Sequence, residues 1–241
     1  MMASKGGQTT LKRIAANKAR KLERKDLTWT IKTMPGPHSD ATAVPLGFVI
    51  RDLLKLASNL KEAKILLNAG KIKVNGIVRK NFKFPVGLFD VVQIDEAKKA
   101  FRLVFEKHGR LEAREIKFAA KQFTVCKIKG KKMLEKGKVQ LVASDGRNFI
   151  ASEKDALAKA KPGDSVLVEF PAKAEKVFEL KKGNTVFVVS GKHVGDIAKI
   201  IGVSASTMSR PKLVTLKAEE KYDTVAENVL VIGEEKSAIE F

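Results

Sequence analysis

The chain has 241 residues, which is enough for one large domain or for two to three small ones. It carries 47 Lys and Arg against 27 Asp and Glu, a formal net charge of +20, and 44% of its residues are hydrophobic. This composition excludes a disordered basic tail, and no apolar run reaches the ~18 residues of a membrane span. The single cysteine, Cys126, excludes an internal disulfide and a cysteine-cluster zinc site. We therefore expect a folded, soluble, intracellular protein whose surface attracts polyanions, with nucleic acid favoured.

Residues 1–43 are predicted to form a basic N-terminal arm. The first 34 residues contain nine basic and two acidic side chains. Thr10 is placed to cap a short helix, and two prolines end it before residue 40. The apolar face of that helix would comprise Leu11, Ile14, Ala15 and Leu22. We interpret the segment as an arm ordered by its partner rather than a frayed terminus. Its candidate phosphate contacts are Lys12, Arg13, Lys18, Arg20, Lys21, Arg24, Lys25 and His38.

Residues 44–106 are predicted to form a small α+β module. Apolar residues recur at helical spacing from Leu46 to Ala57, just after Pro45. A second helix is expected to begin at Asn59 and to end at Gly70. The dipeptide Asn75-Gly76, between alternating apolar residues, predicts a two-residue hairpin turn. Residues 85–94 then predict a turn and a closing strand.

Basic side chains recur through this module, and no acidic residue lies between positions 70 and 85. In the run 71–74 the strand period of two places Lys71 and Lys73 on one face. A solvated lysine face without function is the simpler alternative. We interpret the surface as a track for a phosphate backbone, and expect charge reversal at both lysines to weaken RNA binding. The candidate contacts are Arg51, Lys55, Lys61, Lys64, Lys71, Lys73, Arg79, Lys80 and Lys83.

The segment 56–76 resembles the RNA-binding module shared by ribosomal protein four of the small subunit and several RNA-modifying enzymes. The similarity is carried by Leu56-Ala57-Ser58-Asn59, Glu62-Ala63-Lys64 and Leu67-Asn68-Ala69-Gly70-Lys71-Ile72-Lys73-Val74-Asn75-Gly76. The family pattern has an arginine where this chain has Leu60. The resemblance therefore implies that Lys61 or Lys64 takes over one phosphate contact.

Residues 107–175 are predicted to form a central β-rich domain. Apolar residues alternate with polar ones before Asp145-Gly146, a second hairpin signal, and again after the turn Pro162-Gly163-Asp164. Several lysines crowd around Gly130 and Gly137, which we interpret as a basic loop that contacts RNA, a solvated turn being the alternative. The candidate contacts in it are Lys129, Lys131 and Lys132.

Residues 176–241 are predicted to form a small barrel with an acidic C-terminal end. The run Val186–Ile200 resembles the glycine-punctuated KOW motif of ribosomal and transcription-elongation proteins, with Ala198 where a glycine is usual. It predicts a strand, a tight turn and a returning strand. Strands at Leu213–Leu216 and Val229–Ile232 would complete an SH3-like barrel. We expect RNA contact at its turn through Gly191, Lys192 and His193.

The order of these units is what makes the resemblance specific. A basic arm with Gly36-Pro37-His38-Ser39, the module, the central strands, the KOW run and the ending Glu227–Gly233 together resemble the archaeal and eukaryotic e-type family of protein four of the small ribosomal subunit. The resemblance implies a multidomain α+β protein that binds ribosomal RNA beside neighbouring ribosomal proteins in the cytoplasmic small subunit. It implies no cofactor, metal, membrane, small-molecule substrate or homo-oligomer.

Two other functions stay open as alternatives. Pseudouridine synthases also carry the RNA-binding module, but their catalytic Gly-Arg-Leu-Asp corresponds to Gly109-Arg110-Leu111-Glu112 here, and the longer side chain displaces the carboxylate. A KOW-type transcription-elongation factor would resemble this chain only over residues 186–200. We therefore expect no catalytic residue.

Other chemistries find no motif in the sequence. There is no nucleotide-binding phosphate loop, and His38, His108 and His193 are far apart. Cys126 is expected to be a small buried side chain. Aromatic residues make up 6%, with one Trp and one Tyr, which disfavours base stacking and favours recognition by backbone shape and charge.

Overall fold

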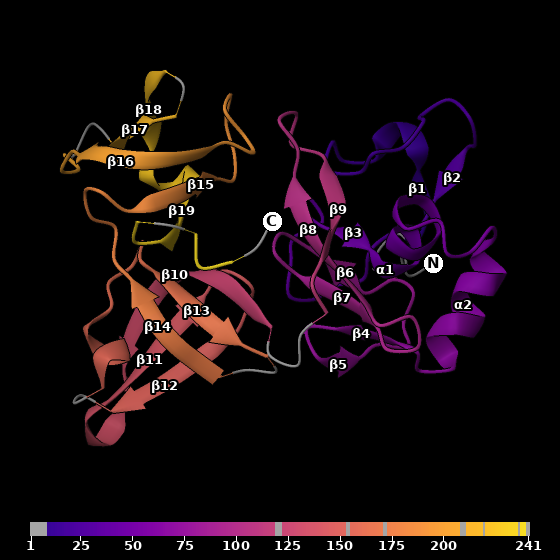
Figure 1. Cartoon of the computed structure of the whole chain (residues 1–241), viewed down its shortest axis with the longest axis horizontal. Helices are drawn as coiled ribbons and strands as arrows, with labels where there is room; N and C mark the ends of the chain where they lie inside the picture. The colour runs from indigo at the N-terminus through magenta and orange to yellow at the C-terminus, as the bar shows by residue number, and fades with distance from the viewer. Residues whose placement is uncertain are drawn as a thin grey trace, which may run out of the picture.

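The computed structural model describes residues 9–118, 122–152, 155–170, 173–207, 211–218, 220–235 and 237–239. Three five-stranded antiparallel sheets dominate it, and Figure 1 shows the N-terminal sheet on the right and the other two, one above the other, on the left. The helix α2 (Leu60–Asn68) is the one α-helix of eight or more residues within these ranges. The protein is therefore mostly β, with fewer helical residues than the predicted α+β class implies.

The N-terminal arm does not contain the predicted helix. A two-stranded ribbon of β1 (Leu11–Lys12) and β2 (Trp29–Thr30) encloses a 3₁₀ turn and an irregular loop. The loop carbonyl of Ala19 accepts a hydrogen bond from Leu111 N at 2.8 Å, and Ala19 itself is buried. The loop thus satisfies its backbone groups against the neighbouring sheet, and the arm packs onto the module.

The first predicted helix of the module is present only as a short segment. It begins at Leu46, whose N–H donates to Phe84 O at 2.8 Å, and Gly47 N donates to Phe82 O at the same distance. A Cβ on Gly47 would lie 3.2 Å from Phe82 O, a contact tight enough to favour glycine at this close approach. The elements here are β3 (Val44–Pro45), α1 (Leu46–Phe48), a π-helical turn (Val49–Leu53) and β6 (Pro85–Val86), which pairs with β3.

The second helix and the first hairpin are confirmed. Asn59 is the N-cap of α2, and Gly70, with a φ of +74°, follows its last turn. Asn75 and Gly76 have φ of 53° and 76°, as a type I′ turn requires, and they join β4 (Ile72–Val74) to β5 (Ile77–Val78). These signals are local in the chain, which is why the sequence displays them.

Strand pairing crosses two of the predicted unit boundaries. The N-terminal sheet, in the order β5-β4-β7-β8-β9, continues to residue 116, so a boundary at 106/107 would cut the β8–β9 hairpin. The central sheet, in the order β12-β11-β10-β13-β14, includes β14, which a boundary at 175/176 would divide. The strands are β7 (Val91–Ile94), β8 (Lys99–Phe105), β9 (Leu111–Ile116), β10 (Phe123–Met133), β11 (Lys138–Ala143), β12 (Asn148–Ser152), β13 (Ser165–Glu169) and β14 (Lys173–Phe178).

Most of the basic loop predicted around Gly130 is a strand. β10 runs for eleven residues and pairs with β13 along its first half and with β11 along its second. Gly130 lies at a shift of register in the pairing with β11, which is typical of a bulge. The hairpin predicted at Asp145-Gly146 is confirmed between β11 and β12, and the turn at 162–164 precedes β13.

The C-terminal sheet has the order β18-β17-β16-β15-β19. The predicted strand, turn and returning strand over 186–200 are confirmed, and the turn contains Gly191 and Gly195 at φ of 104° and 90°. Closure into an SH3-like barrel stays a prediction. The strands are β15 (Thr185–Val188), β16 (Ile197–Val203), β17 (Leu213–Lys217), β18 (Lys221–Val225) and β19 (Val229–Gly233).

The first and last sheets share one hydrophobic core. Phe89 of the module meets Phe187 of β15 edge to face, with ring centroids 5.2 Å apart. Ile232 and Ile239 are buried in the same cluster, which also takes in Val125 of β10. The central and C-terminal sheets each have a further cluster of their own. Residues about 100 positions apart therefore fix how the N-terminal and C-terminal sheets sit together.

Candidate nucleic-acid interface

Two of the arm's predicted phosphate contacts lie inside the protein. Arg13 is 7% exposed, and its Nη1 donates to Glu23 O at 2.8 Å and to Asp26 Oδ2 at 2.9 Å. The side chain of Arg20 is fully buried, where it donates to Ile31 O and to Asp40 Oδ1. Both arginines therefore hold the arm's own loops together rather than facing a partner. The arm's exposed basic side chains are Lys12, Lys18, Lys21, Arg24 and Lys25.

His38 is likewise a structural residue. Its Nε2 lies 2.8 Å from Asp90 Oδ2, and the same carboxylate accepts hydrogen bonds from Asn75 Nδ2 and Gly87 N. A Cβ on Gly87 would lie 2.4 Å from the imidazole Cγ, so the ring packs flat against a backbone that must be glycine. Burial is the largest single influence and disfavours the charged imidazole, but the charge of Asp90, the hydrogen bond to it and the charge of Asp145 together raise the pKa of His38. Despite its burial, Asp90 has a lowered pKa because of His38 and these hydrogen bonds.

Lys71, directly before β4, and Lys73, within it, are engaged in ion pairs; we call the two the β4 lysines. Lys71 Nζ lies 3.0 Å from Glu96 Oε1, and Lys73 Nζ lies 2.7 Å from Asp95 Oδ2. The carboxylates come from the turn after β7, beyond the acid-free run that the sequence displays. The β4 lysines, predicted to belong to the phosphate track, are thus partly neutralised from within the protein.

A second basic surface of the module has a different character, and we call it the α2–loop surface. Lys64 Nζ lies 4.4 Å from the ring centroid of Phe82, and Lys83 Nζ lies 5.7 Å from the same ring. Arg79 Cζ lies 4.5 Å from the Phe84 ring. No carboxylate pairs with these basic groups in the described part of the chain. The surface comprises Lys61, Lys64, Arg79, Lys80 and Lys83 with Phe82 and Phe84.

Aromatic rings hold these cations without removing their charge. A cation over a ring is oriented by the ring's quadrupole and keeps its full charge. The two remaining candidates of the module lie elsewhere. Arg51 pairs with its neighbour Asp52 at 2.8 Å, and Lys55 is exposed at a positive φ of 53°.

The strand β10 carries one basic residue, Lys127, whose structural role is not evident from the sequence. Lys127 Nζ donates to the carbonyls of Ala226, Glu227 and Val229 at 2.6–2.9 Å. Burial lowers its pKa to about 8, although Glu227 opposes the shift. Lys127 therefore joins the central sheet to β19 across about 100 residues of chain.

The predicted contacts of β10 differ among themselves. Lys129 and Lys132 are exposed, whereas Lys131 Nζ donates to Ala158 O. The nearby Cys126 is buried, as predicted, and its Sγ donates to Asp145 Oδ2 at 3.0 Å. Burial raises the pKa of this thiol well above its ordinary value, so it is a poor nucleophile.

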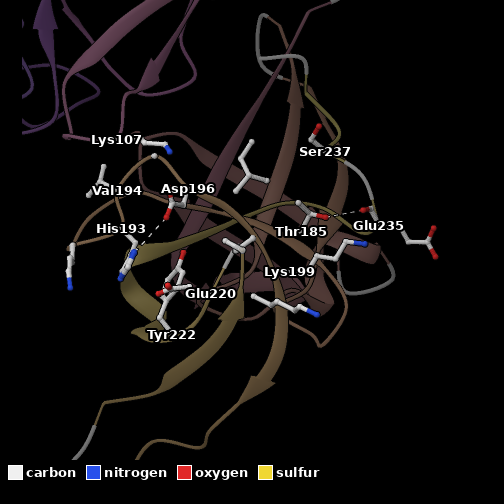
Figure 2. A pocket seen from close by; sticks show the side chains of 16 residues that line it. Lys107, Thr185, His193, Val194, Asp196, Lys199, Glu220, Tyr222, Glu235 and Ser237 are labelled. Carbon is white, nitrogen blue, oxygen red and sulfur yellow. Dashed lines mark hydrogen bonds and ion pairs between the residues drawn. The ribbon is translucent and has the colours of Figure 1, made fainter.

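The turn of the C-terminal sheet borders an open groove of about 990 Å³. Figure 2 shows the imidazole of His193 beside the ring of Tyr222; the rings are stacked at 13°, with centroids 4.0 Å apart. His193 Nδ1 lies 3.7 Å from Asp196 Oδ2. Burial, and to a smaller extent the charge of Asp196, raise the pKa of Tyr222. Tyr222 was not among the contacts predicted from the sequence. The groove's lysines are Lys107, Lys192, Lys199 and Lys217.

The structure thus brings together some predicted contacts and separates others. Lys192 and His193 lie on the groove, and Gly191 is exposed in the adjoining turn. The α2–loop surface is a separate patch on the module. Within the described residues, no group of His, Cys, Asp or Glu is arranged to hold a metal ion, and no helix is long and apolar enough to cross a membrane.

Comparison with known proteins decides the family. The sequence matches the family described as Ribosomal family S4e over residues 95–175 and the RS4NT domain over residues 5–40. It is 38% identical over 245 residues, 99% of both chains, to small ribosomal subunit protein eS4 of Methanococcus vannielii. This chain belongs to the S4e family of ribosomal proteins. The predicted family is confirmed.

Other S4e proteins support the same conclusion. The eS4 protein of Archaeoglobus fulgidus is 39% identical over 229 residues, 94% of each chain. The crystal structure of the 30S ribosomal protein S4e from Thermoplasma acidophilum superposes with a TM-score of 0.67 at 28% identity, over 80% of this chain and 96% of that one. The RS4NT match contains the buried Arg13 and Arg20, whereas the α2–loop surface lies between the two family matches.

Proposed function

We propose that this S4e chain is a structural constituent of the small ribosomal subunit, in the cytoplasm, that binds ribosomal RNA chiefly through phosphate contacts. The observation that carries the proposal is the near full-length identity to curated proteins named small ribosomal subunit protein eS4. The net charge of +20 and the exposed basic side chains support the RNA part. Neighbouring ribosomal proteins are the expected further partners, and one copy per subunit is expected.

The α2–loop surface is the favoured phosphate-binding face of the module. Its cations are exposed or lie over aromatic rings. Because they have no carboxylate partner among the described residues, no ion pair within the protein is lost when they bind a phosphate. Each cation that neutralises a phosphate releases condensed counterions, which provides free energy and makes binding salt-dependent. The arm lysines and the exposed lysines of β10 would extend this contact to other phosphates.

The groove beside β16 is the favoured RNA-facing part of the C-terminal sheet, which we interpret as an SH3-like KOW unit. Lys192 and Lys199 supply positive charge at its rim, and the His193–Tyr222 stack supplies a flat surface against which a ribose or base packs. Asp196 and Glu220 line the same groove, so its field is weaker than that of the α2–loop surface.

A non-catalytic role agrees with the surroundings of the one segment that resembles an enzyme motif. Glu112 lies on β9, the edge strand of the N-terminal sheet, with its Oε2 3.9 Å from Arg114 Nε. An edge strand with a half-exposed carboxylate lacks the enclosure that excludes water from a reacting base. Uridine isomerisation in total RNA that is abolished by Glu112→Ala would establish the enzyme alternative instead.

The direct test is association with the subunit and with its RNA. Tagged protein is expected to sediment with small subunits from an archaeal lysate at moderate salt. Purified protein is expected to bind deproteinised small-subunit ribosomal RNA with an affinity that falls steeply with added KCl. Protein that stays at the top of the gradient and binds this RNA no better at 50 mM than at 500 mM KCl would refute the proposal.

A further inference from the structure

The chain's single tryptophan lies on the surface of its basic arm. Trp29 is 56% exposed, on the outer strand of the β1–β2 ribbon. Figure 1 shows this ribbon at the upper right, away from the central and C-terminal sheets. A large aromatic ring gains much free energy when it is buried, so such exposure on an otherwise packed segment indicates a contact surface.

Trp29 has exposed apolar neighbours close to it in the ribbon. Lys12 is its cross-strand partner, and Arg13 N donates to Thr28 O at 3.0 Å just beyond that pair. Ile14, in the 3₁₀ turn that follows β1, and Leu27, two residues before Trp29, are 72% and 57% exposed, so both add apolar surface next to the Lys12–Trp29 pair in the chain. We call Lys12, Ile14, Leu27 and Trp29 the ribbon face.

The other side of the ribbon anchors it. Arg13 points inward and binds Asp26 and the Glu23 carbonyl, which fixes the loop that follows β1. Leu11, also on the inward side, is only partly exposed. The ring of Trp29 is therefore presented from a braced backbone, which reduces the entropy lost when it meets a partner.

The charge around the ribbon face selects the class of partner. Residues 9–34 contain eight basic and two acidic side chains, and one of the acids, Asp26, is already paired with Arg13. Exposed apolar side chains within such a field suit a ligand that combines negative charge with flat rings. RNA offers both, because its phosphates are regularly spaced and its unpaired bases expose their faces.

We propose that the ribbon face binds a single-stranded stretch of RNA, with an unpaired base stacked on Trp29 and the flanking phosphates held by Lys12 and its basic neighbours. The proposal rests on the proposed RNA-binding function and adds a base contact to it. The low aromatic content disfavours base stacking as the general binding mode, but one exposed ring is sufficient for a local contact. A protein docking on the same face is the competing outcome.

Because Trp29 is the only tryptophan, its fluorescence reports on this face in the intact, unmodified chain. We expect poly(A) and small-subunit ribosomal RNA to quench the emission and to protect the ring from acrylamide. Heparin, a polyanion without bases, should bind to the basic surfaces yet leave emission and acrylamide access nearly unchanged. Anisotropy of labelled RNA measures binding independently of the tryptophan.

The readouts separate the two proposals. RNA that binds by anisotropy while Trp29 stays accessible would overturn the stacking proposal and leave RNA binding intact, and it would point to a protein partner for this face. An equal response to heparin and poly(A) would also overturn it, because charge alone would explain the change. No binding of RNA at all would refute the proposed function itself.

Variants give a second measurement that does not depend on emission. Trp29→Ala is expected to weaken poly(A) binding about 5- to 100-fold, and Trp29→Phe should retain most of the affinity because it retains a ring. Ile150→Ala, at a 65% exposed position in the central sheet, is the matched control and should bind as the unmodified chain does. Circular dichroism confirms that each variant is folded. Equal affinities of Trp29→Ala and Ile150→Ala would overturn the proposal.

Discussion

The lysines of β4 and those of the α2–loop surface lie in one module and look alike in sequence, yet their surroundings differ. Lys71 and Lys73 face the carboxylates of Glu96 and Asp95. Lys64 and Lys83 instead lie over the ring of Phe82, with no carboxylate partner in the residues that the structure describes. What the fold places opposite a lysine, rather than its presence in a basic run, determines whether it is available to a phosphate.

The difference has a thermodynamic consequence. A lysine that leaves an internal carboxylate to meet a phosphate exchanges one ion pair for another, so its net gain is small. A lysine over a ring keeps its full charge, so its contact with a phosphate releases the counterions condensed on the RNA without the loss of another ion pair. The same reasoning separates the buried arginines of the arm from its exposed lysines.

Arg20 and Lys18 give the largest contrast. Arg20→Met is expected to lower the free energy of unfolding by about 2–3 kcal/mol, because it removes a fully buried guanidinium from Asp40 and the Ile31 carbonyl. Lys18→Met, at an exposed site, is expected to change it by less than about 0.5 kcal/mol. Urea unfolding measures both.

RNA binding should rank the two variants in the opposite order. Under conditions where both are folded, Lys18→Met should flatten the salt dependence and Arg20→Met should leave it unchanged. Equal stabilities for the two variants, or a flatter slope only for Arg20→Met, would contradict the internal role of Arg20.

Lys127 extends the comparison to a lysine held entirely by carbonyls. Its pKa of about 8 lies below the ordinary lysine value, so between about pH 8 and 10 the unfolded chain binds more protons at this site than the folded one. The free energy of unfolding should therefore rise with pH, by up to about 1.4 kcal/mol per pH unit. The Lys127→Met variant lacks this contribution. Urea unfolding of the unmodified chain and of Lys127→Met at pH 7.5 and 9.5 measures it. If the two proteins differ in free energy of unfolding by the same amount at both pH values, Lys127 has an ordinary pKa and the prediction is wrong.

The β4 ion pairs are expected to have the smallest effect. Replacing Lys71 and Lys73 together with Gln should lower the free energy of unfolding by less than about 1 kcal/mol, since both pairs are half-exposed. The loss should shrink further as KCl rises from 0.05 to 0.5 M, because salt already screens the pairs. Urea unfolding at the two salt concentrations measures it. A large, salt-independent loss would mean that these lysines stabilise the fold by packing.

Sequence reasoning succeeded where the deciding interactions are local. The turn at Asn75-Gly76 and the end of α2 at Gly70 depend on backbone conformations that those residues adopt readily. The helix predicted in the arm failed, because the burial of Arg13 and Arg20 and the bond from Leu111 to Ala19 depend on residues far along the chain. The same cause explains why strand pairing crosses two predicted unit boundaries, since pairing along the chain assigns β9 and β14 to their sheets.

The candidate interface divides in the same way. Composition predicted a basic RNA-facing surface, and the order of motifs predicted the family. The sequence did not reveal which basic side chains have internal partners: Lys127 meets carbonyls 99 to 102 positions away, and His38 meets Asp90. Tyr222 was not predicted because its stacking partner, His193, lies 29 residues earlier in the turn between β15 and β16, whereas Tyr222 lies in β18.

The salt dependence of binding to small-subunit ribosomal RNA shows whether the lysines of the α2–loop surface, rather than the β4 lysines, contact phosphates. The log–log slope should be compared among the unmodified chain, a variant with Lys61, Lys64 and Lys80 changed to Gln, and the Lys71 and Lys73 double variant. We predict that the first variant flattens the slope by about two to three units and the second by less than one. A double variant that flattens the slope as much as the triple, or a triple that leaves it unchanged, would contradict the account.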